Sequence, residues 1–141
     1  ATWLEECPTD LATFRECIET ELAGSEPAGT LRVAESMRQV GGRHRLFCPD
    51  GLLSEAASVV VENACSRSAG EPVLLEFCAS ERPDATNVVI RSLGTAFRSA
   101  EYRTGGGGIQ GLRRRMGAFG VEVGTRRSGS DFETSFAFLK G

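Results

Sequence analysis

The residues best suited to chemistry are a glycine run and the arginines that follow it. Four glycines occupy positions 105–108, a fifth is Gly111, and arginines fill positions 113–115. Because glycine has no Cβ, such a run lets the backbone approach a ligand closely, and the N–H groups at the start of a following helix favour an anion. The arginines add positive charge nearby. The pattern indicates a site for a phosphate-bearing ligand, although a glycine run by itself is also typical of a flexible linker.

Metal and disulfide chemistry are disfavoured by the cysteines and the histidine. The five cysteines are odd in number, none forms a C-x-x-C pair, and His44 is the single histidine. A zinc site is therefore not expected, and we predict reduced, mostly buried thiols in a cytoplasmic protein. The cysteines are Cys7, Cys17, Cys48, Cys65 and Cys78.

The composition is that of one globular domain. The chain has 141 residues, 40% of them hydrophobic, with 16 basic and 19 acidic residues and a formal net charge of −3. A chain of this length can bury a core without disulfides or metals. The acidic balance argues against general nucleic-acid binding. No apolar run is long enough to span a bilayer, and no signal sequence opens the chain.

The apolar spacing predicts helices in the first half of the chain. Residues 8–22 place Leu11, Phe14, Ile18 and Leu22 on one stripe, which predicts an amphipathic helix. Residues 31–37 and 44–48 are expected to form a hairpin around the turn signal Gly41-Gly42. Residues 52–67 are apolar around much of the circumference, which predicts a buried central helix.

The second half alternates between strands and one helix. Strands are predicted over 73–78 and 87–91, joined by a polar loop at 80–86, and a hairpin over 121–126 and 132–139. Residues 93–108 are predicted to be a long loop and 109–119 a short helix. In the last strand, Phe132, Thr134, Phe136 and Phe138 fall on one face. The order predicts an α+β, two-layer sandwich with a mixed, mostly antiparallel sheet and helices on one face.

Three segments in this order carry a family resemblance. They are Glu62-Asn63-Ala64 on the predicted central helix, residues 90–97 leaving a strand, and residues 105–115 opening a helix. Together they resemble the ATP-binding catalytic domain of two-component sensor histidine kinases, in the family that includes gyrase, Hsp90 chaperones and MutL. The DesK- and NarX-like class is most similar, because Gly111-Leu112-Arg113-Arg114-Arg115 stands where those kinases carry Gly-Met-Arg-Glu-Arg. The resemblance covers residues 10–139.

The resemblance implies a Bergerat-type fold with ATP and Mg²⁺ as cofactors, with Asn63 as the metal ligand and residues 95–107 as a lid. It also implies a dimerisation and phosphoacceptor domain as partner, a response regulator reached indirectly, and no contact with nucleic acid or membrane. The implied cofactor-binding residues are Asn63, Arg67, Ser92, Gly94, Gly106, Gly108 and Gly111.

Three positions depart from the family pattern. Ser92 stands where the family has the aspartate that recognises adenine, and a hydroxyl lacks the charge-assisted acceptor of a carboxylate. Ala96 replaces the second glycine of the same motif. Val59 stands four residues before Asn63, where such kinases carry an acidic or amide residue.

Several functions stay open on these residues. The first is a catalytic domain that supplies the γ-phosphate of ATP to a histidine on a separate domain. The second is a degenerate domain of the same fold that regulates a partner, as a pseudokinase, a phosphotransferase-associated module or a relative of anti-sigma-factor kinases. The third is a structural module unrelated to this family.

His44 is not expected to be the phosphoacceptor, because no acidic residue follows it. The chain also begins without Met. We therefore expect residues 1–141 to be a single kinase-like ATPase domain from a longer sensor kinase, with the acceptor histidine on another segment.

Overall fold

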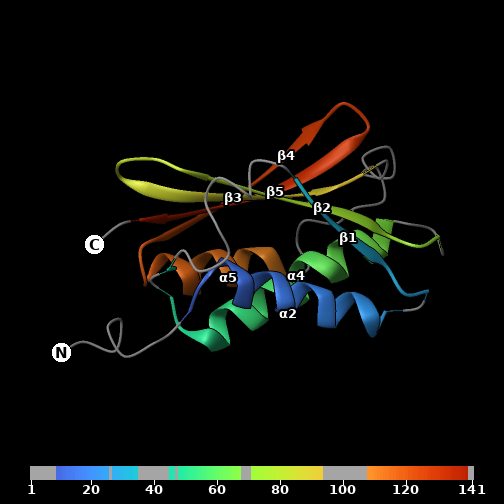
Figure 1. Ribbon diagram of the computed structural model, residues 1–141, viewed down its shortest axis with the longest axis horizontal. Coiled ribbons are helices and arrows are strands. Elements are labelled where there is room, and N and C mark those ends of the chain that lie inside the picture. The colour runs from blue at the N-terminus through green and yellow to red at the C-terminus, as the bar shows by residue number, and fades with distance from the viewer. Residues whose placement is uncertain are drawn as a thin grey trace.

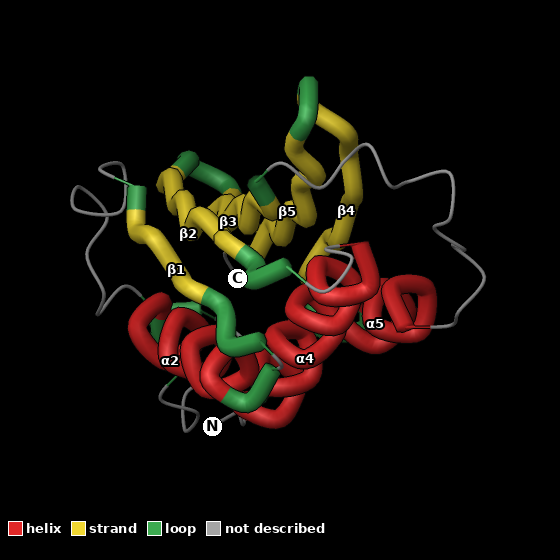
Figure 2. Tube along the Cα trace, turned by 90° about the vertical axis from the view of Figure 1, so that its right-hand side faces the viewer, coloured by secondary structure: helices red, strands yellow, loops and turns green. Residues whose placement is uncertain are grey.

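Three helices lie against one face of a five-stranded sheet (Figures 1 and 2). The computed structural model describes residues 9–25, 27–34, 45–46, 48–67, 71–93 and 108–139, and these counts refer to them. The predicted two-layer α+β fold, with its helices on one face, is confirmed.

The helices agree with the predicted ranges to within a few residues. They are α2 (Leu11–Ala23), α4 (Asp50–Arg67) and α5 (Gly108–Gly117). Helix α2 begins where the Asp10 carboxylate accepts hydrogen bonds from the Thr13 backbone N–H at 2.8 Å and its hydroxyl at 2.9 Å. None of the described helices is both long enough and apolar enough to cross a membrane.

The sheet is mixed and mostly antiparallel, as predicted. Its strands run in the order β1-β2-β3-β5-β4, and only the β1–β2 pair among them is parallel. The strands are β1 (Thr30–Val33), β2 (Leu74–Glu81), β3 (Ala85–Ser92), β4 (Val121–Ser128) and β5 (Asp131–Leu139).

The hairpin predicted over 31–37 and 44–48 is wrong where the structure can test it. Strand β1 pairs in parallel with β2, with Thr30 opposite Leu74, and Arg45 forms an isolated antiparallel bridge with Asp10. The Gly41-Gly42 signal is local, whereas β1 extends the sheet through a distant partner, with α4 lying between the two strands in the sequence. Residues 35–44, with His44 and both glycines, lie outside the described residues, as do residues 94–107 of the predicted loop.

The core lies between the two layers and is organised around Phe14 of α2. Its side chain has no exposed surface, and its ring meets three sheet phenylalanines edge-on. The ring centroids are 5.8 Å from Phe77, 5.3 Å from Phe136 and 6.1 Å from Phe138. On β5, Thr134 is also buried and Phe132 is half-buried, in agreement with the prediction that these two residues share one face with Phe136 and Phe138.

The thiols in the described residues are free, but only Cys48 is buried and the others are half-buried, so the prediction of mostly buried thiols is wrong. Burial raises the pKa of the Cys78 thiol, and the nearby Glu76 carboxylate raises it further. The pKa of Cys17 is also raised, chiefly by burial. Both shifts lower the thiolate fraction at neutral pH, so neither thiol is activated. The free cysteines are Cys17, Cys48, Cys65 and Cys78.

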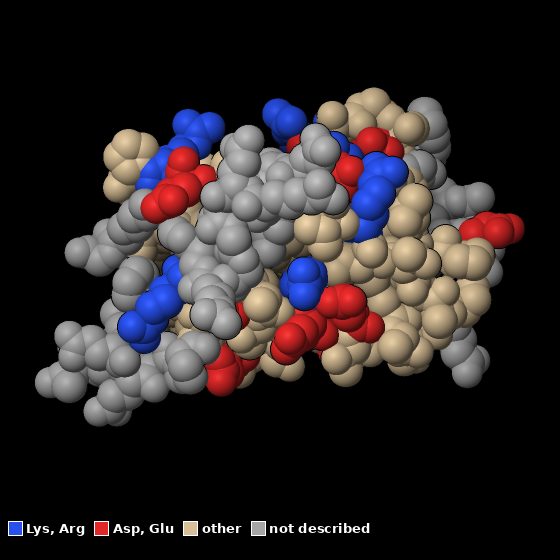
Figure 3. All heavy atoms as spheres, in the orientation of Figure 1, with Lys and Arg blue, Asp and Glu red and all other residues tan. Residues whose placement is uncertain are grey.

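The other face of the sheet carries a row of alternating charges, one from each strand. The row, which we call the charge ladder, consists of Arg32, Glu76, Arg91, Glu133 and Arg126. Its four successive N–O distances are 2.7, 3.0, 2.7 and 3.0 Å. The hydrogen bond to Glu133 raises the pKa of the Arg91 guanidinium. Basic and acidic side chains are interspersed along the sheet side of the molecule, whereas acidic side chains gather over α2 (Figure 3).

Replacing Phe14 with Ala is expected to destabilise the domain by about 3–5 kcal/mol, because the loss removes a buried ring and leaves a cavity between the layers. Urea denaturation followed by circular dichroism measures this change. Phe119→Ala is the matched control, because the Phe119 side chain is 39% exposed. Equal losses of stability in the two variants would contradict the central role of Phe14.

Candidate functional site

One face of α4 meets the beginning of α5 (Figure 2). Glu55, Val59 and Asn63 are four residues apart, so they share a stripe along α4. The Glu55 carboxylate accepts a hydrogen bond from Arg115 on α5. A Val59 methyl lies 3.9 Å from the position that a Cβ on Gly108 would occupy. The stripe that carries Asn63 therefore faces the glycine-led start of α5.

The side chain of Asn63 has an unsatisfied hydrogen-bond donor. The residue is half-buried, and its Nδ2 atom is buried without a hydrogen-bond partner among the residues that the structure describes. A buried polar atom left without a partner is unfavourable and usually has a reason. An oxygen of a bound ligand next to α4 would satisfy it. The arrangement fits the predicted cofactor-binding role of Asn63.

Two of the predicted glycines lie on α5. Gly108 is its first residue, against Val59, and Gly111 lies under Arg115. A Cβ on Gly111 would lie 3.1 Å from the Arg115 Nη1 atom. Gly94 and Gly106 lie outside the described residues, so their predicted roles stay predictions.

The arginines that follow the glycine run contact neighbouring elements, and their predicted charge at the phosphate site stays a prediction. Arg113 donates from Nε to the Val123 carbonyl oxygen at 3.0 Å, which ties α5 to β4. Arg114 and Arg115 lie in the last turn. The helix begins at Gly108, so Arg113 is about 7.5 Å further along its axis. The Arg115 guanidinium nonetheless reaches back to Gly111 in the first turn, and the backbone N–H groups at the start of α5 add a partial positive charge.

Ser92 ends β3 on the side of the sheet that faces the helices. It is 4% exposed and in phase along the strand with Val88 and Ile90, which belong to the core. Its neighbours across the sheet are Leu75 and Phe132. Ser92 therefore faces the same layer as α4.

Two other predicted positions are partly or wholly outside the described residues. Arg67 is the last residue of α4, and its side chain is not described. Ala96 is not described at all. Val59 is 8% exposed, so the apolar departure from the family pattern is packed into the junction of α4 and α5.

The described residues hold no group of three or more side chains suited to a metal. A Mg²⁺ ion at this site would have Asn63 as its one assigned protein ligand, with phosphate oxygens and water completing its shell. Mg²⁺ is commonly held with few protein ligands when it accompanies a nucleotide. The residues therefore fit Mg²⁺ brought by a nucleotide, and they do not form a metal site by themselves.

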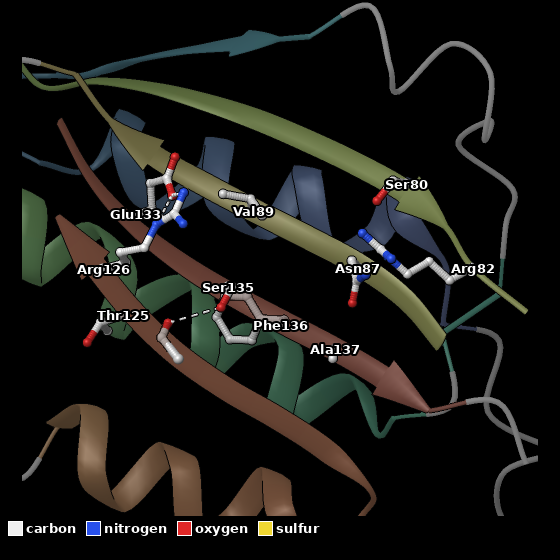
Figure 4. A pocket seen from close by; sticks show the side chains of 11 residues that line it. Ser80, Arg82, Asn87, Val89, Thr125, Arg126, Glu133, Ser135, Phe136 and Ala137 are labelled. Carbon is white, nitrogen blue, oxygen red and sulfur yellow. Dashed lines mark hydrogen bonds and ion pairs between the residues drawn. The ribbon is translucent and has the colours of Figure 1, made fainter. Parts of the chain in front are cut away.

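A cavity of about 480 Å³ lies on the opposite face of the sheet, away from α4 and α5 (Figure 4). It is lined from β2, β3, β4 and β5, so it is distinct from the site that the sequence predicts. Neither this cavity nor the Glu55–Arg115 ion pair was predicted from the sequence. Glu55 lies eight residues before Asn63, which places both on the same face of α4. That spacing is the one sequence signal that could have indicated a role for Glu55.

Comparison with known proteins assigns the fold. No protein-family model and no curated protein sequence match this chain. The fold is that of histidine kinase catalytic domains, as solved structures at 12–13% sequence identity show.

Three such structures illustrate the likeness. The catalytic domain of histidine kinase ThkA, in a nucleotide-free form, has a TM-score of 0.64 at 12% identity, with 91% of this chain and 92% of that chain covered. The mycobacterial sensor histidine kinase MprB has a TM-score of 0.63 at 13% identity, covering 93% and 95%. Histidine kinase AdeS of Acinetobacter baumannii has a TM-score of 0.62 at 12% identity and covers 93% of this chain, which spans 65% of the AdeS chain.

Replacing Gly108 with Ala is expected to leave stability unchanged or raise it by up to about 1 kcal/mol, because alanine favours a helix and its Cβ would make an ordinary contact with Val59. Thermal unfolding measures the effect. Gly120→Ala is the comparison: Gly120 has φ +76°, so alanine there is expected to destabilise by about 1–2 kcal/mol. A large loss of stability in Gly108→Ala would assign this glycine a packing role instead of a ligand role.

Proposed function

We propose that this chain is the ATP-binding catalytic domain of a two-component sensor histidine kinase. The observation that carries the proposal is the buried, unpartnered Nδ2 atom of Asn63, beside the glycine-led start of α5, in a fold shared with histidine kinase catalytic domains. A nucleotide held between α4 and α5 supplies an oxygen for this donor and an anion for the helix start.

In this function each residue has a role that its position supports. Asn63 orients the phosphate group and its Mg²⁺, while the N–H groups at Gly108 and the residues after it hold phosphate oxygens. Ser92 accepts one hydrogen bond from the adenine amino group. The Glu55–Arg115 and Arg113–Val123 contacts fix α5 against α4 and β4. Catalysis then rests on positioning and on neutralising charge.

The phosphoryl group supplied by Mg²⁺-ATP goes to a histidine on a separate dimerisation domain. That domain is the direct partner, and a response regulator receives the phosphoryl group afterwards. We place this reaction in the cytoplasm, where ATP is available.

A degenerate domain of the same fold, acting as a regulatory interaction module, is the second candidate. Val59 favours it, because an apolar methyl fills the junction of α4 and α5 where a second polar ligand is expected. Ser92 favours it as well, because its hydroxyl is a weaker acceptor than a carboxylate. The two candidates differ in whether the domain binds nucleotide.

Titration with Mg²⁺-ATP is expected to raise the melting temperature, since a ligand of the native state stabilises it by mass action. Replacing Asn63 with Ala is expected to weaken nucleotide binding about tenfold and to reduce its dependence on Mg²⁺, because the amide is lost. Isothermal titration calorimetry with and without Mg²⁺ measures both effects.

Asn87→Ala is the matched control, because Asn87 is also half-buried but lies on the opposite face of the sheet. It is expected to bind nucleotide as the unmodified domain does. No stabilisation at millimolar ATP would contradict the catalytic function and leave the regulatory one.

Replacing Ser92 with Asp is expected to tighten ATP binding about tenfold, because a carboxylate accepts a stronger, charge-assisted hydrogen bond from the adenine amino group. Ser92→Asn is the control, because its side chain has a similar size but no charge. Calorimetric dissociation constants for the two variants decide the matter. If Asp binds ATP no more tightly than Asn does, Ser92 is not at the adenine pocket.

A further inference from the structure

The cavity on the open face of the sheet is a trough that runs along β3. Arg126 and Glu133, two members of the charge ladder, lie at one end, and Arg82 at the turn between β2 and β3 lies at the other (Figure 4). In this view α2 and α4 lie behind the sheet and α5 lies past its β4 edge, so the trough is on the face of the sheet away from α4. A volume of about 480 Å³ is within the usual range for small-ligand sites.

An arginine stands at each end of the trough. Arg82 lies at the turn, where its backbone N–H donates to the Ala85 carbonyl oxygen at 2.8 Å. Arg126 on β4 and Arg91 on β3 are both paired with Glu133 on β5, so they lie at the same height in the sheet. From Asn87 to Arg91, the part of β3 that lies between the two guanidinium groups, the strand rises about 13 Å. In Figure 4 the Arg82 side chain extends from its end of the trough over Asn87, and the Arg126 side chain turns toward Glu133.

The lining has an excess of positive charge. Glu133 is the one acidic side chain in it, and its two oxygens are already bonded, Oε2 to Arg91 at 2.7 Å and Oε1 to Arg126 at 3.0 Å. Arg126 uses its Nε and Nη2 atoms for this pair, so it keeps further N–H donors. The exposed Arg82 has no ion pair among the described residues. Both ends can therefore bind an anionic group.

The floor of the trough between the arginines is formed by small and partly apolar side chains. Val89 and Ala137 supply apolar surface, and Gly124 keeps the floor open, because a Cβ there would lie 3.1 Å from the Ser135 hydroxyl oxygen. Hydroxyl and amide groups from Ser80, Ser135 and Asn87 line the trough between its ends. The lining thus combines cationic ends with an apolar middle.

We propose that this trough binds an elongated organic dianion, with one acidic group on Arg82, the other on Arg126 and an apolar chain between them. The site is separate from the proposed nucleotide site. It gives the domain a second ligand, recognised by the length and charge of the molecule.

A series of linear dicarboxylates from succinate to suberate tests this, with octanoate as the matched monoanion and inorganic phosphate as the simple anion. Chemical shifts of the ¹⁵N-labelled domain are followed at Asn87, Val89 and Ala137. We expect the chemical shifts to saturate as each dicarboxylate is added, and the affinity of the dicarboxylate to rise with its chain length. Suberate is expected to bind at least about fivefold more tightly than octanoate. High salt is expected to weaken suberate binding.

Variants assign the two ends. Arg82→Gln and Arg126→Gln are each expected to raise the dissociation constant for suberate about fivefold. Arg127→Gln is the matched control: it lies next to Arg126 on β4, but successive side chains on a strand point to opposite faces. Arg82 lies on an exposed turn, so Arg82→Gln tests the proposal even if Arg126→Gln fails to fold.

The proposal is overturned if octanoate or phosphate binds as tightly as suberate, or if chain length has no effect. It is also overturned if Arg82→Gln leaves suberate binding unchanged, or if Arg127→Gln weakens it as much as Arg82→Gln does. Nucleotide binding is measured separately, so loss of one site does not affect the test of the other.

Discussion

The packing of Phe14 against the sheet phenylalanines is the contact on which the rest of the structure depends. It fixes α2 to one face of the sheet, and α4 and α5 complete the same layer. Because the helices cover one face of the sheet, the other face is left open. The proposed nucleotide site lies between α4 and α5 on the helix side of the sheet, and the charge ladder and the trough occupy the other face.

Sequence patterns predicted the elements whose signals are local. The stripe through Phe14 and Ile18 and the alternation at Phe136 and Phe138 report directly which side is buried. Pairing between distant strands leaves no such signal, so the sequence favours a hairpin between β1 and the next extended segment over its pairing with β2. The parallel partner is 44 residues away, with Thr30 opposite Leu74.

The candidate site was predictable in part for the same reason. Asn63 and Gly108 lie where the resemblance implies, on α4 and at the start of α5. The contacts of Arg113 with β4 and of Arg115 with α4 have no signal in the sequence, because they depend on how α5 packs against its neighbours. The charge ladder takes one residue from each of five strands, so its members have no fixed spacing in the sequence and only the sheet register brings them together.

The parallel pairing of β1 with β2 has a consequence for how the domain assembles. Parallel strands need a crossover connection, and α4, which carries Asn63, lies within the connection between these two. The helix of the proposed site therefore reaches its final position when a contact between distant parts of the chain closes. Such contacts form slowly, since the loop-closure entropy is lost before the contact gives any stability. The nucleotide site is thus expected to mature late in folding, after the local hairpins β2–β3 and β4–β5.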